Sequence, residues 1–292
     1  MEYALLPAAR ETEMTRTSPL WDATLHHLCI DSVRPLPMLE FYRDGFGYRP
    51  ERLADGQWLL AGRERRLLLA QGPANHLGFA AFRFPDRPRL EAYRAHLRQQ
   101  GVNFHPSPTP LFGEEAFVLA DPDGNLLAFG LPKGSDGGSD PLPGRLQHFV
   151  VASTELPAMV AFYRRTLGFV LSDEVWDGQQ RSAAFLRSDA EHHSFAVFRA
   201  AKAGFDHHAC EVTSWNDLRD WADRFANQRV PLWWGPGRHG PGDNLFFMVQ
   251  DPDGNKIELS AELERMPIDQ PARNWPHEQH TLNYWGQAWM RS

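Results

Sequence analysis

The hydrophobic pattern of the chain repeats one order of elements in its two halves. An apolar run opens each half, LHHLCIDS at 25–32 and LQHFVVAS at 146–153, and each run predicts a strand. A segment with apolar residues at helical spacing follows in both halves, and Gly47 or Gly168 should end that helix. The pattern therefore predicts a duplicated module that contains both helices and strands.

Shorter apolar runs follow and predict further strands. In the second half these include 195–198 and 208–212, and residues 215–228 have the spacing of a second helix. Both halves contain the motif DPDGN, at 121–125 and at 251–255, whose Asp and Gly predict a tight hairpin turn. Each module is therefore expected to be a helix-covered sheet with the order βαβββ read twice.

The two halves can be aligned at several points. The motifs FYRDGFGY and FYRRTLGF lie 121 positions apart, as do His27 and His148. The two DPDGN motifs lie 130 positions apart. If His76 is matched with His208, which precede these motifs in their halves, that pair lies 132 positions apart. This alignment places about ten extra residues in the second copy, between its first helix and His208.

The length of 292 residues and a hydrophobic content of 42% suit two globular domains. The sequence GSDGGSDPLPG has the composition of a flexible linker between them. The predicted organisation is an N-terminal arm (1–20), a first domain (21–133), a linker (134–143), a second domain (144–265) and an aromatic tail (266–292).

The charge and the cysteines narrow the choice of partners. A net charge of -7 gives no general attraction to nucleic acid or to an anionic membrane, so a small-molecule partner is expected. Cys29 and Cys210 have no metal-binding spacing and suggest no disulfide framework. No apolar run has the length of a signal peptide or a membrane span, and a cytoplasmic location is expected.

The two DPDGN motifs lead into strands that differ at one position. The residue seven places after the opening Asp is Ala128 in the first half and Glu258 in the second. Side-chain alternation allows His148, His208 and Glu258 to point to one concave face of a sheet. Two imidazoles and one carboxylate suit a divalent metal that keeps open positions for other ligands. The match with His76 favours His208 over His207, and the first half is interpreted as a decayed copy.

These residues resemble those of a type I extradiol ring-cleavage dioxygenase of the vicinal oxygen chelate superfamily, over about residues 21–265. The resemblance implies an α+β fold of two tandem vicinal-oxygen-chelate domains built from paired βαβββ modules. It implies Fe(II), occasionally Mn(II), held by His148, His208 and Glu258 in the C-terminal domain. It also implies O2 as co-substrate, a catechol-type aromatic diol as substrate, and self-association into a homo-oligomer.

Further site residues follow from the same resemblance. The family has an acid–base histidine fifteen residues before the second ligand, which is His193 here, and a substrate-binding histidine nineteen residues before the Glu, which is His239. Imidazole titrates in a range that suits such proton transfers. Where the family usually has a substrate-binding Tyr this chain has Met248, whose thioether donates no hydrogen bond. Another donor would have to replace it, among them Trp234, Arg238 and Asp243, or the substrate would not need it.

Two other functions remain open at this point. One is a non-oxidative isomerase, epimerase or transferase of the same superfamily that uses Ni, Zn or Mn as a Lewis acid. The other is a binding protein of the bleomycin-resistance kind, for which Trp233 and Trp234 could form an apolar clamp. The aromatic tail could dock on the protein's own surface, cover the pocket or bind a second subunit.

Overall fold

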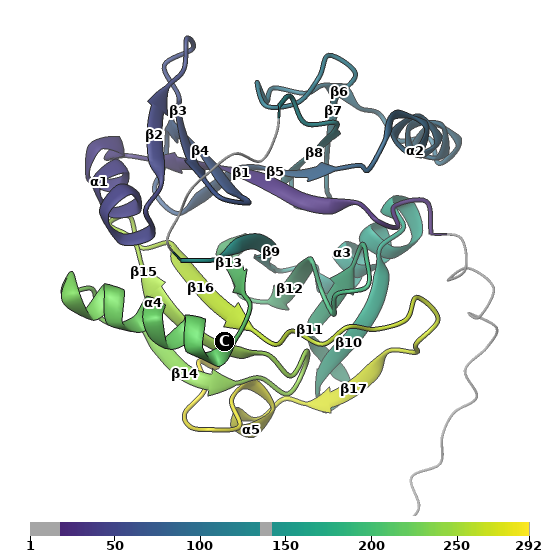
Figure 1. Cartoon of the computed structure of the whole chain (residues 1–292). Coiled ribbons are helices and arrows are strands. Elements are labelled where there is room, and N and C mark those ends of the chain that lie inside the picture. The colour runs from purple at the N-terminus through teal and green to yellow at the C-terminus, as the bar shows by residue number, and fades with distance from the viewer. Residues whose placement is uncertain (1–17, 135–141, 292) are drawn as a thin grey trace, which may run out of the picture.

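The computed structural model of the protein describes residues 18–134 and 142–291. Its strands form two mixed sheets, one from each half of the chain (Figure 1). Most of the predicted arm and linker lies outside the described residues. The predicted α+β class and the duplicated order of elements are confirmed. Among the described residues, no helix is both long and apolar enough to cross a membrane.

The first sheet consists of two βαβββ units that meet at their opening strands. In the described chain its order is β2-β3-β4-β1-β5-β8-β7-β6, in which β1 is antiparallel to β5. The elements are β1 (Thr24–Ser32), α1 (Pro35–Phe46), β2 (Arg49–Arg52), β3 (Trp58–Gly62), β4 (Arg65–Gln71), β5 (His76–Arg83), α2 (Arg87–Gln99), β6 (His105–Pro106), β7 (Phe117–Ala120) and β8 (Leu126–Gly130).

The second sheet repeats this plan and gains one strand from the C-terminal tail. Its described order is β14-β15-β16-β13-β9-β12-β11-β10-β17, and β17 lies parallel to β10 at one edge. The elements are β9 (Arg145–Ser153), α3 (Leu156–Ala161), the π-helical turn η2 (Phe162–Leu167), β10 (Val170–Asp177), β11 (Gln180–Arg187), β12 (Phe195–Arg199), β13 (Gly204–Val212), α4 (Trp215–Asn227), β14 (Trp234–Arg238), β15 (Leu245–Gln250), β16 (Lys256–Ala261), β17 (Arg273–Pro276) and α5 (Gln279–Leu282).

The helix ends follow from local sequence. Gly47 and Gly168 end α1 and η2 in the left-handed conformation, with φ of 71° and 86°, as predicted. The side chains of Asp86 and Ser214 accept hydrogen bonds from the first turns of α2 and α4. The predicted helix at 215–228 is therefore observed, with its last helical residue at Asn227.

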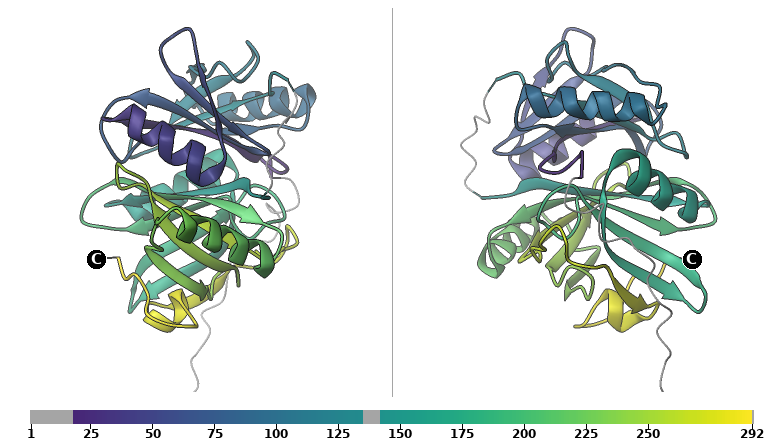
Figure 2. Two further views of the ribbon diagram at one scale, coloured as in Figure 1. Left: turned by 60° about the vertical axis from the view of Figure 1, so that its left-hand side comes forward. Right: turned by 90° about the vertical axis from the view of Figure 1, so that its right-hand side faces the viewer.

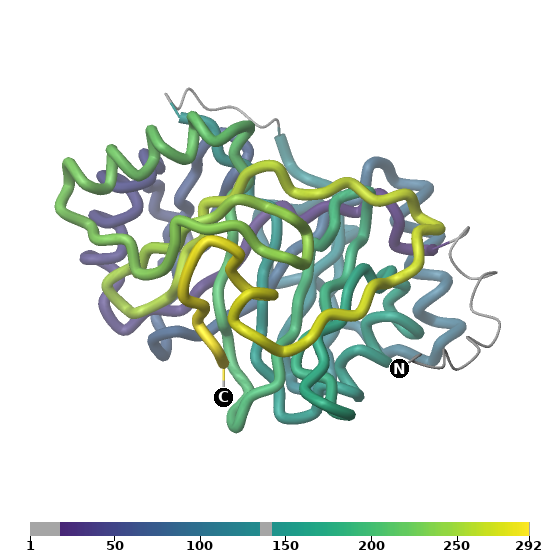
Figure 3. Tube along the Cα trace, turned by 90° about the horizontal axis from the view of Figure 1, so that it is seen from below, coloured from purple at the N-terminus to yellow at the C-terminus, as the bar shows by residue number. Residues whose placement is uncertain are grey.

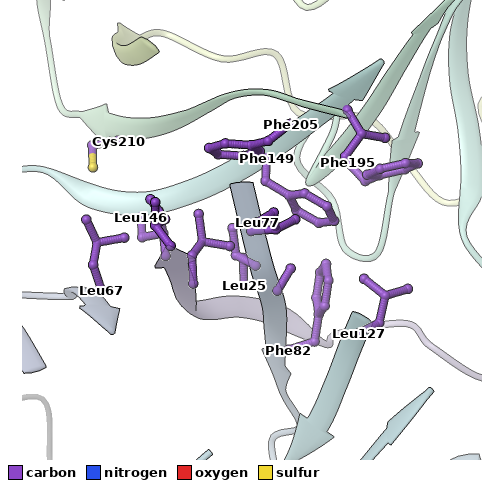
Figure 4. Packing of buried hydrophobic residues seen from close by; sticks show 14 of the residues in the cluster. Leu25, Leu67, Leu77, Phe82, Leu127, Leu146, Phe149, Phe195, Phe205 and Cys210 are labelled. Carbon is purple, nitrogen blue, oxygen red and sulfur yellow. The ribbon is translucent and has the colours of Figure 1, made fainter. Parts of the chain in front are cut away.

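The helix-bearing faces of the two modules pack against each other. One continuous apolar cluster contains residues from β1 and β5 and from β9 and β13, including Leu25, Phe82, Phe149 and Phe205 (Figure 4). The modules lie one above the other in Figure 2. Because this core fills the space between them, the opposite face of each sheet points outward, and the tail runs across the outer face of the second module (Figure 3).

The repeated motifs link the modules. In each DPDGN turn the first Asp accepts hydrogen bonds from the backbone N–H groups two and four residues later. Its other oxygen accepts a hydrogen bond from a tyrosine of the other module. Tyr42 donates to Asp251 and Tyr163 donates to Asp121, both at 3.1 Å. The two motifs found in the sequence are therefore a reciprocal pair of contacts between domains.

Candidate metal centre

Two β-bulges aim the functional side chains at the outer face of the second sheet. The pairing of β9 with β13 shifts between Leu146 and His148, and again between Phe205 and His207. A bulge places two successive side chains on the same face of a strand. The imidazole of His148 therefore points outward beside Gln147, and that of His207 points outward beside Asp206.

The bulges bring three metal-ligating groups together. Nitrogen atoms of His148 and His207 and a carboxylate oxygen of Glu258 all lie within 4.8 Å of one another, and the three residues are buried. The Nε2 atom of His207 is 3.6 Å from Oε2 of Glu258. Glu258 reaches this point from β16, which is parallel to β13, with Ala209 opposite it.

The structure corrects the predicted choice of His208. This residue follows the bulge and faces the core, where its ring stacks on Phe205 with 6.2 Å between centroids. Neither of its ring nitrogens has a hydrogen-bond partner in the described structure, and burial lowers its pKa to about 3. His208 was chosen by its match with His76, whereas the bulge at Asp206 turns His207 to the outer face instead.

The ring orientations of both histidines are fixed through Nδ1. Nδ1 of His148 contacts the side-chain oxygen of Gln147. The amide nitrogen of Gln147 donates to the His193 carbonyl and to Glu191, so its oxygen is the atom that faces His148 and accepts from Nδ1. His207 donates from Nδ1 to Asp206, which also accepts two hydrogen bonds from Arg291 at 2.9 Å. Both Nε2 atoms are left with a lone pair, which is the form that ligates metal.

The charges at the site also fit a cation. Burial lowers the pKa of His148 to about 3, so its imidazole is neutral. Burial would raise the pKa of Glu258, but the nearby His239 and the other imidazoles outweigh it and lower the pKa to about 2. Asn244 donates a hydrogen bond to its Oε1 at 3.2 Å. Two imidazoles and one carboxylate are a suitable donor set for a divalent metal.

The predicted residues His193, His239 and Met248 line the same small cavity. The His193 ring lies 4.3 Å from that of His148, and burial lowers its pKa well below the usual range. His239 donates from Nδ1 to the carbonyl of Leu282, and its Nε2 lies 3.8 Å from Glu258 Oε2. Each of these histidines thus lies beside one of the three metal-ligating residues.

None of the three suggested replacements for the missing Tyr is placed to act as a donor inside the cavity. Asp243 is not among the residues that line the cavity, and its carboxylate lies 3.6 Å from Arg238. Trp234 lines it, but its Nε1 donates to the carbonyl of Gln287. Arg238 binds Glu262 and the backbone of Asp243 instead. Met248 pairs with Glu258 across β15 and β16 and is buried, so its thioether forms an apolar part of the wall.

The tail supplies part of this wall, which is one of the three placements that the sequence left open. Leu282 and Arg291 line the cavity, and the guanidinium of Arg291 lies between the rings of Phe198 and Trp289, at 3.8 and 3.9 Å from their centroids. The cavity volume is about 30 Å³. Typical ligand pockets are about ten times larger or more, so binding an aromatic ring requires wall side chains to move.

The first module lacks this donor set. Phe79 pairs with Cys29, which lies two residues after His27. His207 pairs with Val150, which lies two residues after His148. Phe79 is therefore the counterpart of His207. The predicted match of His76 was wrong, because His76 is exposed at the strand end and binds Asp31. Phe79, Ala128 and neighbouring apolar side chains fill this outer face. Only His27 of the three positions retains a ligating side chain.

The fold and the donor set define a tandem vicinal-oxygen-chelate protein with a candidate metal site in its second domain. The model of the Glyoxalase/Bleomycin resistance protein/Dioxygenase superfamily matches residues 24–129 and 145–259. The chain therefore belongs to this superfamily, as its motifs predicted.

Individual proteins show the same similarity over most of the chain. Metapyrocatechase 2 of Cupriavidus necator is 29% identical over 290 residues, covering 90% of this chain and 88% of the relative. A variant of homoprotocatechuate 2,3-dioxygenase from B. fuscum matches with a TM-score of 0.79 at 21% identity, over 92% of this chain and 80% of that one. The Mn(II)-bound glyoxalase from Novosphingobium aromaticivorans has a TM-score of 0.76 at 23% identity, over 90% of each chain.

Proposed function

We propose that the protein is an extradiol dioxygenase that opens the ring of a catechol-type compound with O2. The observation that carries this proposal is the convergence of His148, His207 and Glu258 on one buried point. His193 and His239 face that point as well. The similarity to metapyrocatechase 2 over most of both chains supports the same reaction class.

The ligands would be His148 and His207, each through Nε2, and the carboxylate of Glu258. They would hold Fe(II), with Mn(II) as the alternative, since two imidazoles and one carboxylate are the usual set for non-haem iron that reacts with oxygen. When bound, Fe(II) would supply the electron path between the aromatic ring and O2 that makes their reaction possible. Both oxygen atoms would enter the product as the carbon–carbon bond beside the diol breaks.

The chain's own residues would position the ring and move its protons. Val150, Phe185 and Phe198 give the cavity an apolar wall that excludes water from the ring. Nε2 of His239 would hydrogen-bond a substrate oxygen, because its Nδ1 is already used on the Leu282 carbonyl. His193 would take and return a proton during the reaction.

Oxygen uptake tests this proposal. Protein reconstituted anaerobically with Fe(II) is exposed to O2 with a panel of catechols, hydroquinones and aminophenols. We expect uptake with formation of a yellow ring-opened product, and we expect its loss in Glu258→Ala. His208→Ala is the matched control, because its side chain faces the core and should leave the reaction intact.

Other outcomes would point to the competing functions. A Zn(II)-loaded protein that retains full activity on its substrate would show non-oxidative chemistry, since zinc does not change oxidation state. Unchanged aromatic-ligand affinity in metal-free protein and in Glu258→Ala, together with no oxygen uptake, would indicate a binding protein. Either result would overturn the dioxygenase proposal.

A further inference from the structure

A buried chain of hydrogen bonds lies behind His193, on the side away from the cavity. The Nδ1 atom of His193 is 2.9 Å from Nδ1 of the adjacent His192. The Nε2 atom of His192 is 2.8 Å from Oδ2 of Asp173 on β10. The side chains of His192 and Asp173 are completely buried. No water therefore competes for these contacts, and the donors and acceptors have to match along the chain.

The carboxylate of Asp173 is the fixed acceptor at the end of this chain. Arg273 donates to it from Nε at 2.8 Å and from Nη2 at 2.9 Å, and Trp275 donates from Nε1 at 2.9 Å. Burial would raise the pKa of Asp173, but His192 and Arg273 outweigh it and lower the pKa. An ionised carboxylate only accepts hydrogen bonds. The proton on His192 must therefore sit on Nε2.

The position of the His192 proton determines which nitrogen of His193 carries a proton. Burial lowers the pKa of His192, so the ring is neutral and carries a single proton. With Nε2 protonated, Nδ1 of His192 can only accept. The contact at 2.9 Å then requires His193 to donate from its own Nδ1. A neutral His193 has no second proton, and its Nε2 is left with a lone pair toward the cavity.

We propose that Asp173 and His192 are positioning residues that hold His193 in the tautomer with its proton on Nδ1. In this tautomer Nε2 can accept a proton from a substrate hydroxyl: the O–H bond breaks, an N–H bond forms, and the same proton is later returned to an oxygen of the product. The opposite tautomer would present an N–H group to the cavity and could not accept it. Only the proton transfer to Nε2 of His193 rests on the proposed function; the tautomer itself does not.

The arrangement has a specific energetic advantage as well. Once Nε2 is protonated, the His193 ring carries a positive charge beside two other imidazoles. Asp173 can stabilise that charge through His192, since both hydrogen bonds of the chain already point from His193 toward the carboxylate. Arg273 and Trp275 keep the carboxylate in place while the proton moves.

Imidazole nitrogen spectra of the metal-free, full-length protein labelled with ¹⁵N-histidine test the tautomer directly. His193→Gln identifies the His193 signals by their disappearance. We expect a protonated Nδ1 and a bare Nε2 in the wild type. Asp173→Asn removes the negative charge that holds the proton on Nε2 of His192, so both rings should lose the single tautomer and show a mixture. Asp177→Asn, an exposed residue of the same strand, is the matched control and should change neither ring.

Two variants of His192 test the same inference if Asp173→Asn does not fold. His192→Asn keeps an acceptor oxygen near the former Nδ1 and should keep the His193 tautomer. His192→Leu removes the acceptor and should leave a mixture of tautomers. In an active protein, kcat should fall roughly a hundredfold in His192→Leu and recover in large part in His192→Asn, with KM nearly constant.

A wild-type spectrum with the proton on Nε2 of His193 would overturn the inference, and so would unchanged tautomers in both Asp173→Asn and His192→Leu. These spectra are recorded without metal or substrate. The spectra therefore test the tautomer assignment independently of oxygen uptake. Absence of ring cleavage with the expected spectra would refute the proposed reaction and leave the hydrogen-bond chain established.

Discussion

The Nε2 atom of His207 lies 3.6 Å from Oε2 of Glu258, while the neighbouring His208 points into the core. His207→Ala should therefore weaken metal binding by more than about a hundredfold, because even an outer partner of a ligand contributes ten- to a hundredfold. His208→Ala should leave metal affinity nearly unchanged and cost about 1–3 kcal/mol of stability.

Calorimetric titration with Mn(II), an air-stable probe, measures both affinities, and urea unfolding measures both stabilities. The two variants differ by one position and remove the same side chain, so they control for each other. Equal loss of metal in both, or a loss in His208→Ala alone, would contradict this assignment.

Asp206 orients His207 and is held by Arg291 from the tail. Burial would raise the pKa of Asp206, but the charge and hydrogen bonds of Arg291 outweigh it and lower the pKa. Asp206→Ala should reduce metal affinity by about ten- to a hundredfold, measured by the same titration. Asp220→Ala, at an exposed site on α4, is the control. An affinity equal to the wild type in Asp206→Ala would show that the contact does not orient the ligand.

Met248 lies where the family has a Tyr, and it contributes only apolar surface. Met248→Leu should therefore keep kcat for the best substrate within about threefold, since no hydrogen bond is lost. Met248→Tyr should raise kcat with an unsubstituted catechol by about tenfold or more, because one positioned donor can contribute a hundredfold or so. Steady-state oxygen uptake compares the three proteins. A drop of more than tenfold in Met248→Leu would show that the thioether itself is required.

Glu211 should make stability depend on pH. Burial raises its pKa to about 7 from an ordinary value of 4.5, against hydrogen bonds from Ser260 and the Leu263 N–H. The folded state therefore binds this proton more tightly. The associated stability is complete below pH 4.5 and is lost as pH rises through 7, on the order of 3 kcal/mol in total.

Glu211→Gln should remove this loss. Urea unfolding should show the variant gaining stability over the wild type as pH rises from 5 to 8. Glu40→Gln on the exposed face of α1 should follow the wild type at both values. Parallel pH curves for Glu211→Gln and the wild type would show that the buried carboxyl is not responsible.

The sequence predicted those parts of the fold that depend on local signals. The opening strands, the glycine helix ends and the DPDGN turns are all observed, because each depends on a few adjacent residues. It did not predict that Tyr42 and Tyr163 bind the turn of the opposite module. Those contacts join residues far apart in the chain, and no local pattern encodes them.

The candidate site was predicted in type and mispredicted in one residue. His148, Glu258, His193 and His239 lie together, as the family resemblance implied, although His193 precedes His207 by fourteen residues and not by the expected fifteen. His208 was chosen by matching it to His76, which assumed an offset that the strand register does not support. A bulge adds one residue without any clear sequence signal, since Asp206 is not a glycine. Alternation within strands is therefore least reliable near functional sites, where bulges are frequent.

The tail shows a second limit. Its composition indicated aromatic contacts, and three kinds of docking were open. The structure places β17 along β10 and Arg291 against Asp206, so the tail covers the protein's own site. This depends on a buried ion pair between residues that have no sequence relationship to each other.

One metal should bind in the second domain, on His148, His207 and Glu258. Anomalous diffraction at the manganese or iron edge, from crystals of the metal-loaded protein, tests it most directly. We predict one strong peak per chain, within bonding distance of Nε2 of both histidines and of the Glu258 carboxylate. A peak beside His208 or His27, or no peak at these three residues in protein that binds metal in solution, would contradict it.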